Sequence, residues 1–198
     1  GIDSSIVAHF MTEFSSKPIK TYSIIINNQE KENIKLISNK LNTQHHNIYL
    51  EKNQLKLIDK IIKFNEDLVA DPTLIPQYLI SKSAKKKVKV LLTGSGADDL
   101  YGGYSIFKVM ANSEFHSMHK RPEKRYLRYK SLLRDDFSTK EKRKLFLDHK
   151  NYNPYSFLKK YFYSNQDMIN QVSFLLVEKY LINNILIKVN QMFIANSI

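Results

Sequence analysis

Hydrophobic and polar positions follow two alternating patterns in the first half of the chain. Segments with apolar residues at helical spacing predict amphipathic helices, and they cover residues 6–14, 30–41, 53–65 and 74–85. Short runs rich in β-branched residues predict strands, and they cover residues 19–26, 44–50 and 88–92. Because strands and helices alternate, the pattern predicts an α/β fold with a doubly wound parallel sheet.

The second half has a different pattern, in which only helical spacing recurs. The predicted helices cover residues 104–116, 122–134, 138–146, 154–163 and 168–180 or beyond. Proline or serine and threonine stand at several of the expected helix starts. We therefore expect an α/β part over residues 1–104, followed by a helical part over residues 105–198.

Glycines are concentrated at the junction of these two parts. Of five glycines in the chain, four lie within residues 91–104, directly after the predicted strand 88–92. Two adjacent acids, Asp98 and Asp99, separate the glycine pairs. Open α/β sheets bind ligands at the carboxyl ends of their strands, so the stretch predicts a ligand-binding turn. An ordinary strand-to-helix turn is the alternative.

The first five residues, Gly-Ile-Asp-Ser-Ser, precede another predicted helix. Backbone N–H groups and hydroxyls at a helix start can bind an anion, and the helix dipole favours one there. Simple N-capping explains the same residues. Both segments are expected at strand ends on one edge of the sheet, and this shared position favours a common ligand site.

Composition limits the chemistry that this chain can perform. Its 198 residues are 42% hydrophobic and include no cysteine, so disulfides and thiolate metal sites are excluded and a reducing, cytoplasmic compartment is expected. No apolar run reaches the roughly 18–20 residues of a membrane span. The sequence therefore predicts no membrane association.

The net charge of +12 is unevenly distributed. Residues 105–180 carry 16 basic and 8 acidic side chains, whereas residues 1–104 carry 14 and 11. A basic, tyrosine-rich region could bind nucleic acid through phosphates. We interpret it instead as a solvated helix face, and nucleic acid is not an expected partner.

Five segments, in order, resemble the synthetase domain of glutamine-hydrolysing asparagine synthetases, which are PP-loop ATP pyrophosphatases with an adenine nucleotide alpha-hydrolase-like fold. Residues 1–5 resemble the end of the signature Ser-Gly-Gly-x-Asp-Ser-Ser, and residues 93–104 resemble Ser-Gly-Glu-Gly-Ala-Asp-Glu-Leu-Phe-Gly-Gly-Tyr. Residues 71–81, 43–46 and 185–192 resemble Asp-Pro-Ser-x-Ile-Pro-x-Tyr-Leu-Leu-Ser, Thr-x-His-His and Ile-Leu-x-Lys-Val-Asp-Arg-Met.

This resemblance implies an enzyme that activates a carboxylate with ATP, releases pyrophosphate and forms an amide with ammonia. Gly1, Ser4 and Ser5 would hold the pyrophosphate through N–H groups and hydroxyls. Asp3 and Asp98 would coordinate Mg²⁺, which would make Asp98 a catalytic residue as well. ATP and Mg²⁺ are therefore the expected cofactors.

The adenosine pocket follows from the same resemblance. The family forms it mostly from backbone groups, at its own second strand and at the start of its glycine-rich box, which corresponds to residues 93–104 here. The corresponding residues of this chain are Ser23, Ile24, Ile25, Thr93 and Gly94. By contrast, adjacent residues of a strand point to opposite faces, so we expect His45 and His46 to have packing or surface roles rather than a joint metal site.

Two catalytic positions of the family carry different residues here. Ser95 replaces a Glu, and Gln191 follows Asn190 in place of an Asp-Arg pair. A hydroxyl cannot replace a carboxylate as a base, and the cation that would face phosphate or substrate is lost. Aspartate as substrate is thus one of three open interpretations, beside an enzyme acting on another acid and a non-catalytic remnant.

The family's remaining parts are expected outside this chain. They include a central strand before Gly1 and a glutaminase domain that supplies ammonia. Without that strand, we expect the chain to fold poorly alone and to be inactive. The expected partners of the full-length protein are a small amino-acid substrate and ammonia, and the resemblance leaves a homodimer open.

Overall fold

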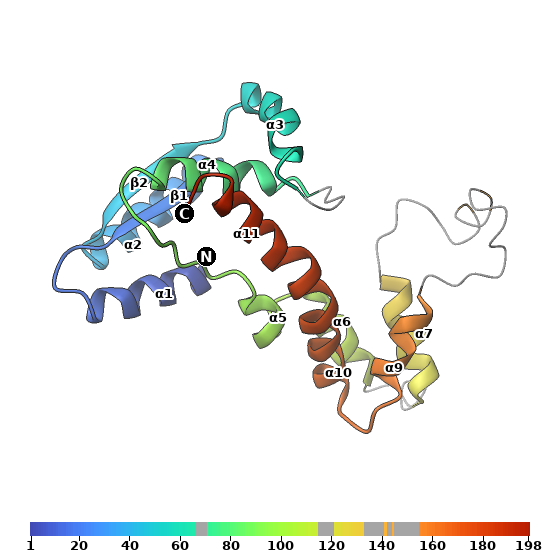
Figure 1. Ribbon diagram of the computed structural model, residues 1–198. Coiled ribbons are helices and arrows are strands. Elements are labelled where there is room, and N and C mark those ends of the chain that lie inside the picture. Colours follow the sequence, from blue (N-terminus) through green and yellow to red (C-terminus); the bar gives the residue numbers. More distant parts are fainter. Residues whose placement is uncertain (66–70, 115–120, 133–140, 142–143, 145–154) are drawn as a thin grey trace. The chain divides into compact units, whose positions relative to one another are not determined.

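The structure, a computed structural model, describes residues 1–65, 71–114, 121–132, 141, 144 and 155–198. The chain divides into two compact units (Figure 1). Unit 1 comprises Gly1–Gly96 and Leu181–Ile198, and unit 2 comprises Ala97–Tyr180. The sequence pattern places its division after residue 104 instead, so the two divisions differ on residues 97–104 and 181–198.

Unit 1 contains a parallel pair of strands, β1 (Lys20–Ile25) and β2 (Gln44–Tyr49). Their register runs from Lys20 opposite Gln44 to Ile25 opposite Tyr49. Helix α2 (Asn28–Lys40) forms the crossover between them, and the Asn27 side chain caps it by accepting a hydrogen bond from the Glu30 N–H. Two predicted strands and the helix between them are therefore confirmed.

The third predicted strand is wrong for the described structure, because residues 88–92 are not assigned to a strand. Val90 and Leu92 are 73% and 59% exposed. A parallel strand needs a hydrogen-bonding neighbour, and among the described residues β1 pairs with β2 alone. Unit 1 is thus a mixed α/β unit with a two-stranded parallel sheet, and the doubly wound sheet is not confirmed.

The helices of unit 1 differ from the prediction mainly at their starts. Helix α1 (Ile2–Glu13) begins earlier than expected, so residues 3–5 form its first turn rather than a preceding loop. The predicted helix 53–65 is a 3-10 helix, η1 (Lys52–Leu57), that continues into the short α3 (Ile58–Ile62). Helix α4 (Leu74–Ala84) agrees with the prediction within one residue.

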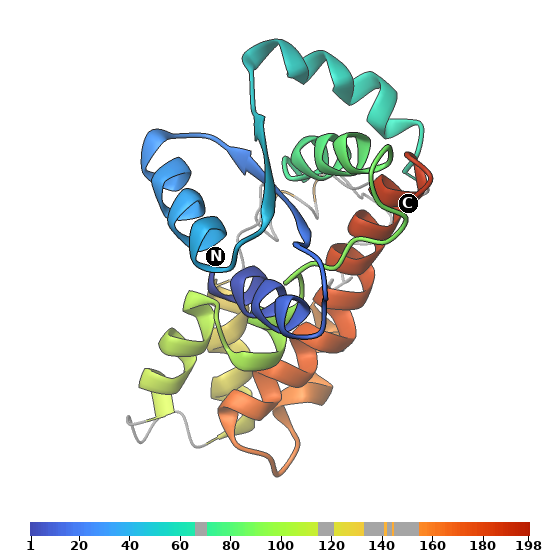
Figure 2. The same cartoon turned by 90° about the vertical axis from the view of Figure 1, so that its left-hand side faces the viewer.

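The core of unit 1 lies where α4 packs against α11 (Ile187–Ile194). Both views show these helices side by side (Figures 1 and 2). The buried side chains at this contact are Ile61, Leu74, Ile75, Tyr78 and Met192. A segment from the end of the sequence is thereby tied to the α/β unit.

The described residues of unit 2 form helices joined by turns, with no strand among them. It contains α5 (Ala97–Tyr101), α6 (Ser105–Glu114), α7 (Pro122–Leu132), the 3-10 helix η4 (Ser156–Leu158), α9 (Lys159–Phe162) and α10 (Met168–Leu175). The π-helix η5 (Leu176–Leu186) follows, and the unit boundary lies within it. Apart from residues 141 and 144, the predicted helix 138–146 lies outside the described residues.

Aromatic side chains dominate the core of unit 2. Helices α6, α7 and α9 contribute buried Phe107, Tyr126, Tyr129, Tyr161 and Phe162. Rings of Tyr129 and Phe162 lie 5.2 Å apart between centroids, within the range of favourable aromatic pairs. This tyrosine-rich segment therefore has its own hydrophobic core.

Candidate functional site

The two segments that the sequence placed at one edge of the sheet do meet in unit 1. The backbone of Gly94 lies against the first turn of α1. A Cβ atom at Gly94 would lie 2.7 Å from the Ser4 backbone nitrogen and 2.8 Å from Asp3 Cβ. Only glycine permits this approach, so the contact explains why residue 94 is a glycine.

A cavity of about 470 Å³ opens beside this contact. Six predicted nucleotide residues are among those that line it: Gly1, Ser4, Ser5, Ser23, Thr93 and Gly94. Ser95 lines it as well, whereas Asp3, Ile24 and Ile25 are not among the lining residues. Its volume falls within the roughly 300–1,000 Å³ of typical ligand sites. Most of the predicted nucleotide residues are therefore gathered around one concave space.

The start of α1 offers backbone donors to this cavity. Gly1 is the N-cap and makes no side-chain capping bond, and the first N–H groups of a helix have no intrahelical acceptor. The Ser5 hydroxyl donates back to the Gly1 carbonyl oxygen at 2.9 Å, whereas Ser4 is exposed. Within the described residues Ser4 is thus the hydroxyl of this turn that is free to donate outward, and the helix dipole favours an anion here.

Ser95 lies in a tight turn near the start of the glycine-rich box. Its backbone N–H donates to Thr93 Oγ1 at 3.2 Å, and its side chain is exposed. Such a turn, closed by a threonine hydroxyl, fixes the local backbone rather than the serine side chain. The position that carries Glu in the family therefore offers only an uncharged hydroxyl here.

The acids of the box belong to α5, in unit 2, whereas Asp3 belongs to unit 1. Asp99 is 0% exposed, and the Tyr104 hydroxyl donates to its Oδ2 at 3.0 Å. Burial raises the pKa of Asp99, and the bond from Tyr104 reduces that rise without cancelling it. Asp98 is only partly buried. The two neighbouring carboxylates therefore have different surroundings.

Gln191, at the family's Arg position, lies in α11 of unit 1. Its Oε1 is buried and has no hydrogen-bond partner among the described residues. An orphaned buried acceptor is costly unless a donor reaches it. The structure does not bring Gln191 to the cavity lined by Ser4 and Gly94.

Sequence reasoning missed an ion pair that ties α11 to the start of α4. Lys188 is 2% exposed, and its ammonium hydrogen-bonds with Asp71 Oδ2. Both residues stand inside segments quoted for the family resemblance, at 71–81 and 185–192. The sequence signal for this pair was a lysine, Lys188, among the apolar residues of a helical segment, together with an acid, Asp71, in a distant segment.

The two adjacent histidines of β2 have separate surroundings. His45 Nδ1 is hydrogen-bonded with Thr21 Oγ1 at 2.8 Å, and the residue lines the cavity. Burial lowers the pKa of His45, so its ring is neutral at pH 7. His46 instead stacks on Tyr22 and lies 3.3 Å from Lys87 Nζ. Among the residues that the structure describes, no group of three or more His, Cys, Asp or Glu could hold a metal ion.

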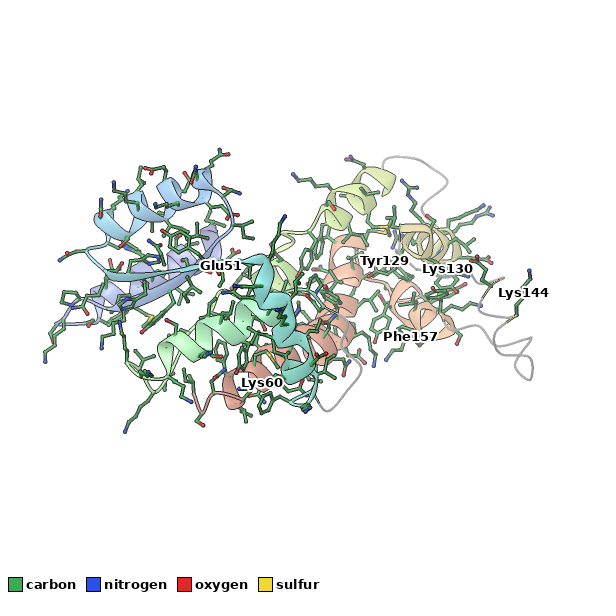
Figure 3. The ribbon with its side chains drawn as sticks, turned by 90° about the horizontal axis from the view of Figure 1, so that it is seen from above. Glu51, Lys60, Tyr129, Lys130, Lys144 and Phe157 are labelled. Atoms are coloured by element: carbon green, nitrogen blue, oxygen red, sulfur yellow. The ribbon has the colours of Figure 1, made fainter. Side chains whose placement is uncertain are left out.

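Unit 2 has an apolar cavity of its own, of about 380 Å³. Tyr129, from α7, and Phe157, from η4, contribute to its wall (Figure 3). Tyr104 lines it too and places its ring edge-on to Tyr180, with the centroids 6.2 Å apart. Within the described ranges, no helix has both the length and the apolar character needed to cross a membrane.

Comparison with known proteins identifies the chain's relatives. The family model for asparagine synthase matches residues 1–198. Asparagine synthetase [glutamine-hydrolyzing] 1 of Bacillus subtilis (strain 168) is 35% identical over 112 residues, which is 54% of this chain. Putative asparagine synthetase [glutamine-hydrolyzing] 2 of Methanocaldococcus jannaschii is 35% identical over 108 residues, or 52% of this chain.

Asparagine synthetase B [glutamine-hydrolyzing] of Escherichia coli (strain K12) is a more distant relative, 25% identical over 132 residues that cover 58% of this chain. The matched regions are 18%, 21% and 24% of the lengths of these three relatives, so the chain spans about a fifth of each. No solved structure matches. Because the family model covers every residue, the chain belongs to the asparagine synthase family.

Proposed function

We propose that the full-length protein carrying this chain is a cytoplasmic ATP-dependent ligase of the asparagine synthetase type. One observation carries the proposal. The Gly94 backbone lies against Asp3 and Ser4, beside a cavity that most of the predicted nucleotide residues line. Family membership supports the same reaction class, and the residues gathered at this cavity are the ones that we propose to bind ATP.

The proposed reaction has two steps. A carboxylate oxygen of the acid attacks the α-phosphorus of ATP, the bond from that phosphorus to pyrophosphate breaks, and an acyl-adenylate forms. Ammonia then attacks the acyl carbon, AMP leaves with the former carboxylate oxygen, and loss of a proton gives the amide. We propose that a glutaminase domain of the full-length protein supplies the ammonia from glutamine.

Residues of unit 1 would bind the nucleotide. The free N–H groups at the start of α1 and the Ser4 hydroxyl would hold the pyrophosphate, where the helix dipole favours negative charge. The adenosine would lie against Ser23, Thr93 and Gly94. Backbone groups would supply most of these contacts, which fits a wall containing glycine.

Asp3 and Asp98 are the residues that we propose as ligands of Mg²⁺, which neutralises charge on the leaving pyrophosphate when it is bound. Their carboxylates are hard oxygen donors of the kind this ion prefers. Mg²⁺ is commonly held by one or two carboxylates plus substrate phosphates.

A second candidate function is a related ligase that acts on an acid other than aspartate. Ser95 presents a neutral hydroxyl at the family's Glu position, and Gln191 presents a neutral amide at its Arg position. A charged amino-acid substrate loses two possible ion-pair partners as a result. A non-catalytic protein that still binds the nucleotide is the third candidate, and the same two substitutions favour it.

Pyrophosphate release by the full-length protein separates these candidates. We expect release with Mg²⁺, ATP, glutamine and one acid from a panel of amino-acid carboxylates that includes aspartate. The Asp3→Ala variant should lose it, whereas Asp59→Ala, an exposed acid of α3, should keep it. Nucleotide binding by calorimetry without release for any acid would identify the non-catalytic protein, and absent binding would contradict all three.

A further inference from the structure

The end of α5 fixes the backbone that carries Asp98. Gly102 adopts φ +75°, and the Gly103 N–H donates to the Asp98 carbonyl oxygen at 3.0 Å. This is the Schellman motif, in which one residue has a left-handed backbone conformation and the N–H of the next residue donates to the carbonyl oxygen five positions earlier. The glycine pair therefore closes the helix on Asp98 itself.

The Asp98 carboxylate lies directly over Gly103. A Cβ atom at Gly103 would overlap Asp98 Oδ1 and lie 2.8 Å from its Cγ. The nearest of these atoms belong to a side chain that can rotate, and the Asp98 Cα lies 3.1 Å away, so a methyl group would displace the carboxylate and press lightly on the backbone of Asp98. Gly103 thus determines where this carboxylate can be.

Asp99 anchors the same helix from the other side. Its carboxylate is buried and accepts the Tyr104 hydroxyl, and its carbonyl oxygen accepts the Ser173 hydroxyl of α10 at 3.1 Å. By contrast, the Asp98 carboxylate makes no hydrogen bond within the described part of the chain. Of the two acids, Asp99 therefore holds α5 in place, whereas the Asp98 carboxylate has no hydrogen-bond partner among the described residues.

We propose that Gly103 is a positioning residue for Asp98, and that Asp99, Tyr104 and Ser173 hold α5 so that this carboxylate is presented to a divalent cation. The inference rests on the proposed function, because that function makes Asp98 a cation ligand. Groups that orient a metal ligand typically contribute 10–100-fold to metal affinity. Glycine at 103 and tyrosine at 104 thereby gain a role in cation binding.

Two neighbouring glycines give a matched test. Gly103→Ala displaces the carboxylate without requiring a positive φ, whereas Gly102→Ala strains the backbone at φ +75° and meets only Phe107 at ordinary contact distances, 3.6 Å and beyond. We expect Gly102→Ala to lower Tm by about 2–8 °C and to weaken cation binding less than Gly103→Ala does. We expect Gly103→Ala to change Tm less and to weaken cation binding about tenfold.

Cation binding is measured on the full-length protein with the Mn²⁺ complex of ATP, by loss of the free complex's paramagnetic resonance signal. ATP in excess EDTA is the metal-free reference, and its affinity should be equal in wild type and Gly103→Ala. The Tyr104→Phe variant should weaken binding of the Mn²⁺ complex several-fold. Its control, Tyr126→Phe, removes a buried hydroxyl that has no partner in the described structure and should leave that binding unchanged.

The Asp98→Asn variant separates this inference from the proposed function. If Asp98→Asn binds the Mn²⁺ complex as wild type does, Asp98 is not a ligand and the proposed cation site is wrong. If Asp98→Asn loses binding but Gly103→Ala retains it, the ligand assignment stands and the positioning role is overturned. Equal losses for Mn²⁺-ATP and metal-free ATP in Gly103→Ala would likewise overturn it.

Discussion

Lys188 carries a positive charge into the interior of unit 1. Its ammonium hydrogen-bonds with Asp71, which also accepts the Thr73 N–H at 2.8 Å and the Thr73 hydroxyl at 2.6 Å. Burial favours the neutral form of Asp71, but these hydrogen bonds outweigh it, and the pKa of Asp71 falls below its ordinary value. A few polar atoms therefore fix the start of α4 against α11.

Removing the cation should destabilise unit 1 strongly. In Lys188→Met the Asp71 carboxylate stays largely buried without its partner, and breaking a buried pair costs about 3–5 kcal/mol. We expect a decrease of about 3 kcal/mol in the free energy of unfolding, measured by urea denaturation. The double variant Asp71→Asn with Lys188→Met should recover part of the loss, and a single variant as stable as wild type would contradict the importance of the pair.

The same pair predicts a specific dependence of stability on pH. Because the pKa of Asp71 is lower in the folded than in the unfolded chain, the ionised carboxylate stabilises the fold above its ordinary pKa of 3.8. This stabilisation is lost as the pH falls from 3.8 through the folded value. The difference in urea midpoint between wild type and Asp71→Asn should therefore be constant at pH 5–7 and shrink below pH 3.8. A difference that grows on acidification would refute the assignment.

Helices α4 and α11 are joined by a second polar contact at the element scale. The Asn196 amide, 4% exposed just after α11, donates to Ser81 Oγ at 2.8 Å and to the Tyr78 carbonyl at 3.3 Å. Ser81 in turn donates to the Met192 carbonyl at 2.8 Å. Hydrogen bonds buried between two helices select one register of packing, because a shifted register would leave these groups unsatisfied.

Truncating this amide should weaken the helix pair. In Asn196→Ala the buried oxygens lose a donor, at a cost of about 1–3 kcal/mol. Asn190→Ala is the matched control, since Asn190 is exposed on α11 and its loss should change stability by at most about 0.5 kcal/mol. Thermal unfolding of both variants measures the effect. Equal stability of the two would show that the amide contacts contribute nothing.

Local pattern predicted those elements whose partners are near in sequence. The strands β1 and β2 with α2 between them form a unit that their own periodicity specifies. Residues 88–92 have the same strand composition, yet a strand exists only where a neighbour pairs with it. The family's central strand, expected before Gly1, is our prediction for the strand that would pair with residues 88–92.

At the scale of the whole molecule, the gathering of the proposed nucleotide residues was predictable because motifs mark them. Ser4, Thr93 and Gly94 do line one cavity. The different surroundings of Asp98 and Asp99 could not be read from the sequence, because they depend on contacts of α5 with Tyr104 and Ser173. The Lys188 pair was equally hidden, since it joins segments 117 positions apart.

The account's central claim is that the full-length protein activates an acid by adenylation. Incubation with Mg²⁺, ATP, ammonia and an acid labelled with ¹⁸O in its carboxylate tests this claim most directly, by mass spectrometry of the nucleotide product. Attack of the carboxylate on the α-phosphorus predicts AMP that carries one ¹⁸O atom. Label in inorganic phosphate together with ADP, or AMP without label, would contradict the claim.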